Sequence, residues 1–214
     1  MGTLADIRKA APQFSLNGTI GAEGFWLKTQ SINGVRYLIV ASADDRGVLY
    51  GTFALLRKIA TGESISELDE KQAPAAPVRW LNLWDTLGGF PMGMTPPQPP
   101  AGGRSQTGAA PAPQASSMRM AGSVLWEDGR ARQDLSRLND FARMLASVGV
   151  NGAAISIVNA DPRLMDPGFA PELQKIAAVL RPWGVRVVLP VDFGSPQTVG
   201  KLPSFDPIDE RVAA

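Results

Sequence analysis

The sequence contains no cysteine and no histidine. Without cysteine the chain can form no disulfide, no thiolate zinc site and no cysteine nucleophile, and without histidine it has no imidazole general base. Carboxylates, lysine, tyrosine and hydroxyl groups are therefore the side chains left for catalysis. No glycine pattern after a strand is of the kind that holds a phosphate, so a dinucleotide site is not indicated.

An excess of charge of one sign is also missing, because 21 lysine and arginine residues stand against 20 aspartate and glutamate residues. The net charge of +1 favours neither nucleic acid nor an anionic membrane surface as a partner. No apolar run is long enough for a membrane span, and the start of the chain lacks the regions of a signal peptide. We therefore expect no membrane partner, and a cytoplasmic location for the chain as given, or a secreted or periplasmic one if a signal precedes it.

The first part of the chain has the pattern of a β-hairpin. Residues 23–30 and 35–42 are rich in aromatic and β-branched residues, and Asn33-Gly34 lies between them. Asn-Gly is the strongest short-range hairpin signal, because both residues tolerate positive φ.

A helix is predicted after the hairpin. Asp44 or Asp45 can cap its start, and Gly62 suits its left-handed end. Residues 67–76 are polar and contain proline, so they are expected to form a connector.

After Pro77 short apolar strands alternate with amphipathic helices, which is typical of parallel βαβ units. The strands are expected at 78–84, 152–158 and 185–191 and the helices at 134–148 and 171–181. The first helix is predicted to bury apolar residues and to end before Gly149; these residues are Leu135, Leu138, Phe141, Leu145 and Val148. Residues 90–117 are rich in proline and glycine and poor in large aliphatic residues, so they are predicted to be a flexible insertion.

Several strings, in order along most of the chain, resemble the α-glucuronidases of glycoside hydrolase family 67. They are Asp45–Gly51 followed by Phe53 and Leu55–Arg57, then Val78–Asp85, Arg119–Trp126, Ser147–Gly152, Val158–Ala160, Leu180–Arg186, Phe193–Pro196 and Asp206–Asp209. The sequence departs from the family pattern at Leu83, which replaces a histidine, at Thr86, which replaces an asparagine, and in the insertion before Arg119.

The resemblance implies an α/β fold in two parts. Residues 1–76 would be the C-terminal part of an α/β N-terminal domain, consisting of the hairpin and its helix. Residues 77–214 would be the first three βα units of an incomplete (β/α)8 TIM barrel, interrupted by the flexible insertion.

The resemblance also implies a function: an inverting enzyme that removes (4-O-methyl)glucuronic acid from glucuronoxylan oligosaccharides in xylan degradation, without cofactor or metal. Such a reaction needs an acid and a base roughly 6.5 to 9.5 Å apart. In this family those carboxylates lie on later barrel strands, so no residue here is assigned as catalytic and the chain alone is expected to be inactive. Members of the family are often homodimers.

Three residues are predicted to bind the substrate: Trp84, Asp85 and Asn159. Trp84 is the last residue of the first predicted barrel strand, at the end where barrel enzymes build their sites, and its ring could stack on the uronic acid. The alternative is that Trp84 packs in a core between domains. Asp85 and Asn159 could each accept a sugar hydroxyl or instead cap a loop.

Two other functions are compatible with the residues alone. One is a non-catalytic carbohydrate-binding or scaffold remnant, and the other is a doubly wound α/β binding domain, for which the glycine fingerprint is missing.

Overall fold

The computed structural model describes residues 1–83, 123–155 and 162–191, and near the carboxyl end residues 197, 200–204, 206 and 208–210. These residues divide into two compact units. The first comprises Met1–Leu81, Ser136–Ala154 and Ala177–Val188, and the second comprises the described residues of Asn82–Leu135, Ile155–Ile176 and Leu189–Ala214. The predicted domain boundary between residues 76 and 77 stays a prediction.

A four-stranded sheet forms the amino-terminal part of the first unit, with strand order β1-β3-β2-β4. The strands are β1 (Gly2–Thr3), β2 (Phe25–Ile32), β3 (Val35–Ser42) and β4 (Asp69–Gln72). β2 pairs antiparallel with β3 and β4, and β1 pairs parallel with β3. Asn33 and Gly34 have φ of 51° and 80°, so the predicted hairpin and its turn are confirmed.

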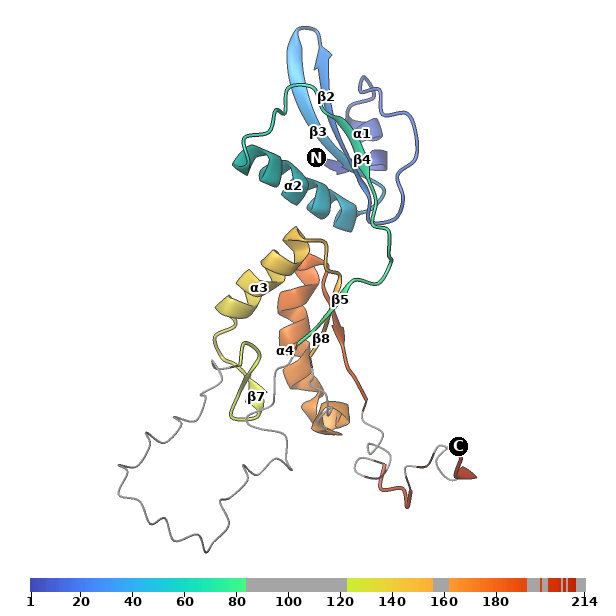
Figure 1. Cartoon of the computed structure of the whole chain (residues 1–214), viewed down its shortest axis with the longest axis vertical. Coiled ribbons are helices and arrows are strands. Elements are labelled where there is room, and N and C mark those ends of the chain that lie inside the picture. The colour runs from blue at the N-terminus through green and yellow to red at the C-terminus, as the bar shows by residue number, and fades with distance from the viewer. Residues whose placement is uncertain are drawn as a thin grey trace, which may run out of the picture. The chain divides into compact units, whose positions relative to one another are not determined.

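Helices α1 (Leu4–Ala10) and α2 (Asp45–Ala60) cover opposite faces of this sheet (Figure 1). Alternating strand residues bury their side chains in two clusters, one on each face. The α1 face contains Leu4, Ile7, Leu16, Trp26, Ile39 and Ala41, and the α2 face contains Phe25, Leu27, Val40, Tyr50 and Leu68. Each face of the sheet is therefore covered by a cluster of buried side chains.

Two glycines let helix α2 approach the sheet closely, while Tyr50 of the helix lies in the core and Leu55 packs against it. A Cβ atom at Gly47 would lie 2.0 Å from Ser42 Oγ, and one at Gly51 would lie 2.7 Å from Val40 Cγ1. Leu56 and Ile59 are exposed instead. The predicted start and end are confirmed, since Asp44 caps α2 and Gly62 has a φ of 73°.

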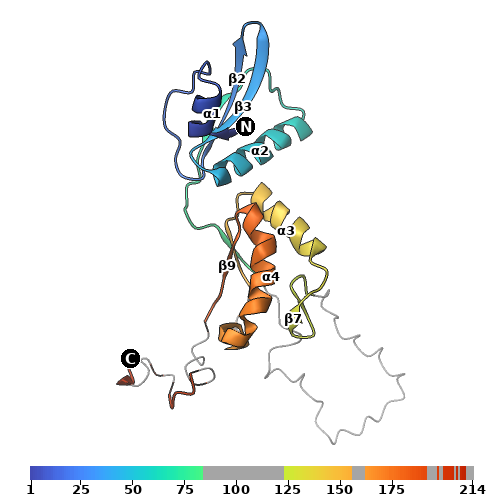
Figure 2. The same cartoon turned by 180° about the vertical axis from the view of Figure 1, so that it is seen from behind.

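A second, three-stranded sheet has the order β5-β8-β9. Its strands are β5 (Trp80–Asn82), β8 (Gly152–Ala154) and β9 (Arg186–Val188), all shorter than predicted. β8 and β9 pair in parallel, with Gly152 opposite Arg186, which confirms the βαβ interpretation for this pair. Figures 1 and 2 show the chain running along all three strands in the same direction. The described residues thus form an open sheet and no closed barrel.

The helices of this region are α3 (Ser136–Ser147) and α4 (Ala170–Leu180). Leu138, Ala142, Leu145 and Ala146 of α3 are buried. The prediction that Val148 points inward is wrong, because the helix ends at Ser147 and Val148 is 65% exposed. Gly149 and Gly184 have φ of 79° and 70°, as expected for helix stops.

The described residues of the second unit include a short hairpin of β6 (Trp126–Glu127) and β7 (Arg130–Ala131). The backbone N–H of Ala131 donates to Glu172 Oε2 at 2.9 Å, which joins the hairpin to the start of α4. None of the helices within the described ranges is both long and apolar enough to cross a membrane.

Candidate functional site

The predicted substrate-binding residues follow the carboxyl ends of neighbouring strands. β5 ends at Asn82 and β8 at Ala154, and these strands are adjacent in one sheet. Trp84 and Asp85 follow the last residue of β5 by two and three positions, and Asn159 follows the last residue of β8 by five. All three lie outside the described residues, so their role stays a prediction. The described strands lead toward one edge of the sheet, where parallel α/β folds place their ligands.

A buried charged cluster lies at the opposite, amino-terminal ends of these strands. Its centre is Glu23, whose side chain is 16% exposed and whose carboxylate accepts hydrogen bonds from Arg46, Arg79 and Asn151. The Asn151 amide nitrogen lies 3.2 Å from Glu23 Oε2, and Asn151 is only 4% exposed. Two guanidinium groups therefore share one carboxylate in a largely desolvated place.

The electrostatics of this cluster favour the ionised carboxylate. Burial is the largest single influence and raises the pKa of Glu23, but the hydrogen bonds from Arg79, Arg46 and Asn151 together outweigh it, so the pKa lies below its usual value of 4.5. Burial also raises the pKa of Tyr50, and the nearby charge of Glu23 adds to that effect. The Arg79 guanidinium lies over the Tyr50 ring, 5.6 Å from its centroid. Glu23 is thus held as an anion among cations.

Backbone geometry brings Glu23 into this position. Its φ is 55°, a left-handed conformation that is uncommon for residues other than glycine. The N–H of Glu23 donates to Asp44 Oδ2 at 2.8 Å, while Asp44 Oδ1 accepts the N–H of Gly47 at 2.8 Å. One carboxylate therefore caps α2 and also holds the backbone of Glu23, two residues before β2.

Sequence reasoning did not find this cluster. Glu23 is separated from Arg79 by 56 residues and from Asn151 by 128 residues, and no local pattern links them. The available signal was indirect: Arg46, Arg79 and Asn151 each lie within one of the strings that resemble the family.

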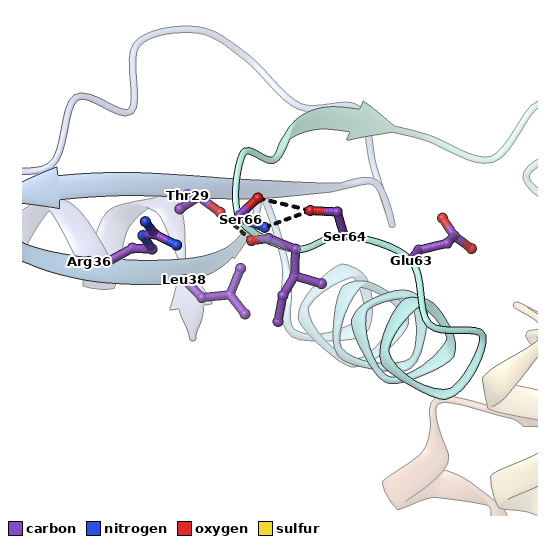
Figure 3. Close-up of a pocket in the computed structure, with 7 residues that line it drawn as sticks. Thr29, Arg36, Leu38, Glu63, Ser64 and Ser66 are labelled. Carbon is purple, nitrogen blue, oxygen red and sulfur yellow. Dashed lines mark hydrogen bonds between the residues drawn. The ribbon is translucent and has the colours of Figure 1, made fainter.

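A shallow pocket lies between the β2–β3 hairpin and the loop that follows α2 (Figure 3). It is lined by Thr29, Arg36, Leu38, Glu63, Ser64, Ile65 and Ser66 and has a volume of about 470 Å³. The two serine hydroxyls lie 2.8 Å apart and bond to each other, and Thr29 Oγ1 donates to the Ile65 carbonyl at 3.0 Å. Because these polar groups are already bonded within the protein, we assign the pocket no ligand.

Metal binding finds no support in the part of the chain that the structure describes. No group of three or more carboxylates there could hold a metal ion.

Comparison with known families gives two matches. Residues 1–55 match the model of the glycosyl hydrolase family 67 N-terminus, and residues 118–214 match the model of the glycosyl hydrolase family 67 middle domain.

Curated relatives agree with these matches. An alpha-glucuronidase of Hypocrea jecorina is 34% identical over 214 residues, which cover 99% of this chain and 22% of the relative. Alpha-glucuronidase A of Emericella nidulans is likewise 34% identical, with the same coverage of both chains. A probable alpha-glucuronidase A of Aspergillus fumigatus is 33% identical over 207 residues, or 96% of this chain and 20% of the relative. The chain spans about a fifth of the length of these relatives.

Proposed function

Because the chain belongs to glycoside hydrolase family 67, we propose that it forms part of an inverting α-glucuronidase acting on glucuronoxylan oligosaccharides. The reaction releases (4-O-methyl)glucuronic acid from xylo-oligosaccharides. The observation that carries the proposal is the agreement of two family matches, in the order N-terminus then middle domain, with relatives that are named alpha-glucuronidases.

In this proposal β5, β8 and β9 are the first three strands of a (β/α)8 barrel. The parallel pairing of β8 with β9 and the sequential strand order support it. Sequential parallel strands joined by helices are the repeating unit of that fold, and its sites lie at the carboxyl ends of the strands.

In this proposal the groups that carry out the hydrolysis are different from the residues that bind the uronic acid. One carboxylic acid protonates the oxygen that leaves with xylose, and a carboxylate on the other side of the sugar ring activates water for attack. We assign neither group to this chain. Trp84, Asp85 and Asn159 would instead bind the uronic acid, with the indole ring stacked on the sugar and the two polar side chains accepting or donating hydrogen bonds to its hydroxyls.

The test uses the product of the complete open reading frame that contains these 214 residues. Release of glucuronic acid from glucuronoxylo-oligosaccharides is measured for the wild type and for Trp84→Ala. We expect kcat/KM to fall about tenfold to hundredfold, since losing the stacking surface should cost about 1.4 to 2.8 kcal/mol of transition-state binding.

Trp183→Ala is the matched control. The Trp183 indole N–H donates to Asn139 Oδ1 at 2.9 Å in a turn that follows α4, so its loss should change kcat/KM less than about threefold. An unchanged kcat/KM in Trp84→Ala would remove this residue from the site. Binding of the oligosaccharide without any hydrolysis by the wild type would favour the carbohydrate-binding alternative.

A further inference from the structure

Three asparagines of this chain are followed by glycine: Asn17, Asn33 and Asn151. An Asn-Gly pair is prone to deamidation, because glycine has no side chain to shield its backbone nitrogen and leaves the peptide free to rotate. The glycine nitrogen attacks the side-chain amide carbon, a C–N bond forms, and ammonia leaves as a cyclic imide closes. Water then opens the imide at either carbonyl and gives isoaspartate or aspartate. The reaction needs no enzyme, but the nitrogen and the amide carbon must be able to meet.

Asn151 cannot reach this geometry in the folded protein. It is 4% exposed, and its side-chain amide donates to the Pro77 carbonyl at 2.8 Å and to Glu23 Oε2 at 3.2 Å. Its Oδ1 accepts the N–H of Arg79 at 3.0 Å. Rotating the side chain toward the nitrogen of Gly152 would break all three bonds, and Gly152 is itself paired with β9. The fold therefore protects Asn151.

Asn33 is exposed but is held by the hairpin turn. Asn33 and Gly34 are the two residues between β2 and β3, and the strands pair up to the turn, with Ile32 opposite Val35. The φ of 51° places Asn33 in the left-handed region, where the next nitrogen lies on the far side of the Cα–C bond from the side chain. The attack would require the turn to rotate out of the paired strands, so the hairpin protects Asn33.

Asn17 meets neither restraint. It lies with Gly18 in the loop that joins α1 to β2 (Figure 1), and both residues are exposed. Within the described residues nothing forms a hydrogen bond with the Asn17 side chain or with the Gly18 N–H. Gly18 has a φ of 126°, which a residue with a side chain rarely adopts. The peptide between the two residues can therefore turn toward the side-chain amide.

The surroundings of Asn17 are basic, which favours the attack. Arg8 Nη2 donates to the Leu16 carbonyl at 2.8 Å and to the Gly18 carbonyl at 3.4 Å. A Cβ atom at Gly18 would lie 2.8 Å from Lys71 Nζ, so this ammonium is close to the residue whose nitrogen reacts. As the C–N bond forms, negative charge develops on the amide oxygen, and nearby cations stabilise it.

We propose that Asn17 is a modification site, at which the folded protein deamidates spontaneously and accumulates isoaspartate, while the fold protects Asn33 and Asn151. The inference is independent of the proposed function, since no substrate takes part. The net change is the uptake of one water and the release of one ammonia. Opening of the imide leaves an exposed carboxylate beside Arg8 and Lys71, and isoaspartate also adds one carbon to the main chain.

The test incubates the product of the complete reading frame at neutral pH and follows the three Asn-Gly peptides by mass spectrometry after digestion. Deamidation exchanges an NH2 group for OH and is read as the corresponding increase in mass. In the folded protein the Asn17 peptide should deamidate at least about tenfold faster than the peptides of Asn33 and Asn151, since protected sites react only through local opening. In urea the three rates should agree within about threefold, because the fold no longer separates them.

Isoaspartate gives a second readout, because an isoaspartyl methyltransferase transfers the methyl group of S-adenosylmethionine to its carboxylate and not to that of aspartate. After incubation the wild-type peptide that contains residue 17 should accept methyl groups, and the Asn17→Gln peptide should not, since glutamine would have to close a larger ring. Asn33→Gly is the matched control. It keeps the turn in its left-handed conformation and should leave methylation at residue 17 at the wild-type level.

Equal deamidation rates of Asn17 and Asn33 in the folded protein would overturn the inference. A preference for Asn17 that is as large in urea would also overturn it, because the fold would then not decide the site. Deamidation of Asn17 without methyl acceptance would exclude the cyclic imide and likewise contradict the proposal.

Discussion

At the scale of single residues, the carboxylate of Glu23 is bonded to three side chains, those of Arg46, Arg79 and Asn151. The carboxylate compensates Arg46 and Arg79, and both guanidinium side chains are at least three-quarters buried, with 24% and 20% exposed. Removing one partner of a buried ion pair leaves an uncompensated charge, which commonly costs about 3–5 kcal/mol. Replacing a whole buried ion pair with apolar residues of similar volume, in contrast, is often nearly neutral.

The lowered pKa of Glu23 predicts a specific pH dependence of stability. Because the folded-state pKa lies below the unfolded value, ionised Glu23 stabilises the fold above about pH 4.5, and this contribution is lost as pH falls through the folded pKa. The difference in unfolding free energy between wild type and Glu23→Gln should therefore be largest at neutral pH and shrink toward pH 3. Urea denaturation at several pH values measures it.

Glu63→Gln provides the comparison for this experiment. Hydrogen bonds from Lys58 and Thr61 also lower the pKa of Glu63, but its side chain is 53% exposed and solvent screens the pair. The difference in unfolding free energy between wild type and Glu63→Gln should therefore change much less with pH. A difference between wild type and Glu23→Gln that stays constant from pH 7 to pH 3 would contradict the assigned electrostatics.

At the scale of elements, the start of α2 determines how the hairpin and the helix meet. The Asp44 carboxylate caps α2 through the N–H of Gly47 and also accepts the N–H of Glu23. Asp45, the next residue, is exposed and lies in the first turn of the helix. Either aspartate could cap the helix by its position in the sequence. In the structure Asp44 caps it and also binds the backbone of Glu23, whereas Asp45 does not cap it.

Replacing each aspartate with alanine separates these roles. Asp44→Ala loses a cap and a second hydrogen bond, so the free energy of unfolding should fall by about 2 kcal/mol. Asp45→Ala loses only a favourable interaction with the helix dipole and should cost about 0.5 kcal/mol. Urea denaturation at pH 7 measures both. Equal losses in the two variants would show that Asp44 does not connect the two elements.

Elements with strong local signals were predictable. The Asn33-Gly34 turn, the capped α2 and the glycine stops after α2 and α3 follow from conformational preferences that act over a few residues. β4 was missed because its sequence, Asp69 to Gln72, is polar and forms a strand only by pairing with β2. The connector predicted at residues 67–76 therefore contains a strand that tertiary pairing created.

At the scale of the whole molecule, β5 is an outer strand of its sheet and carries exposed apolar side chains. Trp80 is 51% exposed and Leu81 is 37% exposed. An outer strand with apolar residues is a template for pairing with another chain. The 214-residue chain studied alone is therefore expected to self-associate.

A charge on this strand should reduce that association. We expect light scattering after size-exclusion chromatography to show oligomers for the wild-type chain and mainly monomer for Leu81→Lys. Met144→Lys, which changes a residue of α3 that is 49% exposed, should leave the oligomers unchanged. A wild-type chain that is monomeric and melts cooperatively would contradict this prediction.

The sequence by itself determined the local elements and the family, because turns, caps and ordered strings depend on residues that are close along the chain. The tertiary structure alone decided which faces are buried and which charged residues meet. Gly47 and Gly51 allow α2 to lie close to its sheet, since a Cβ atom at either position would clash with β3. Glu23 lies 56 residues from Arg79 and 128 residues from Asn151 along the chain, and only the fold brings the three together. No pattern within one segment of the sequence could predict such contacts.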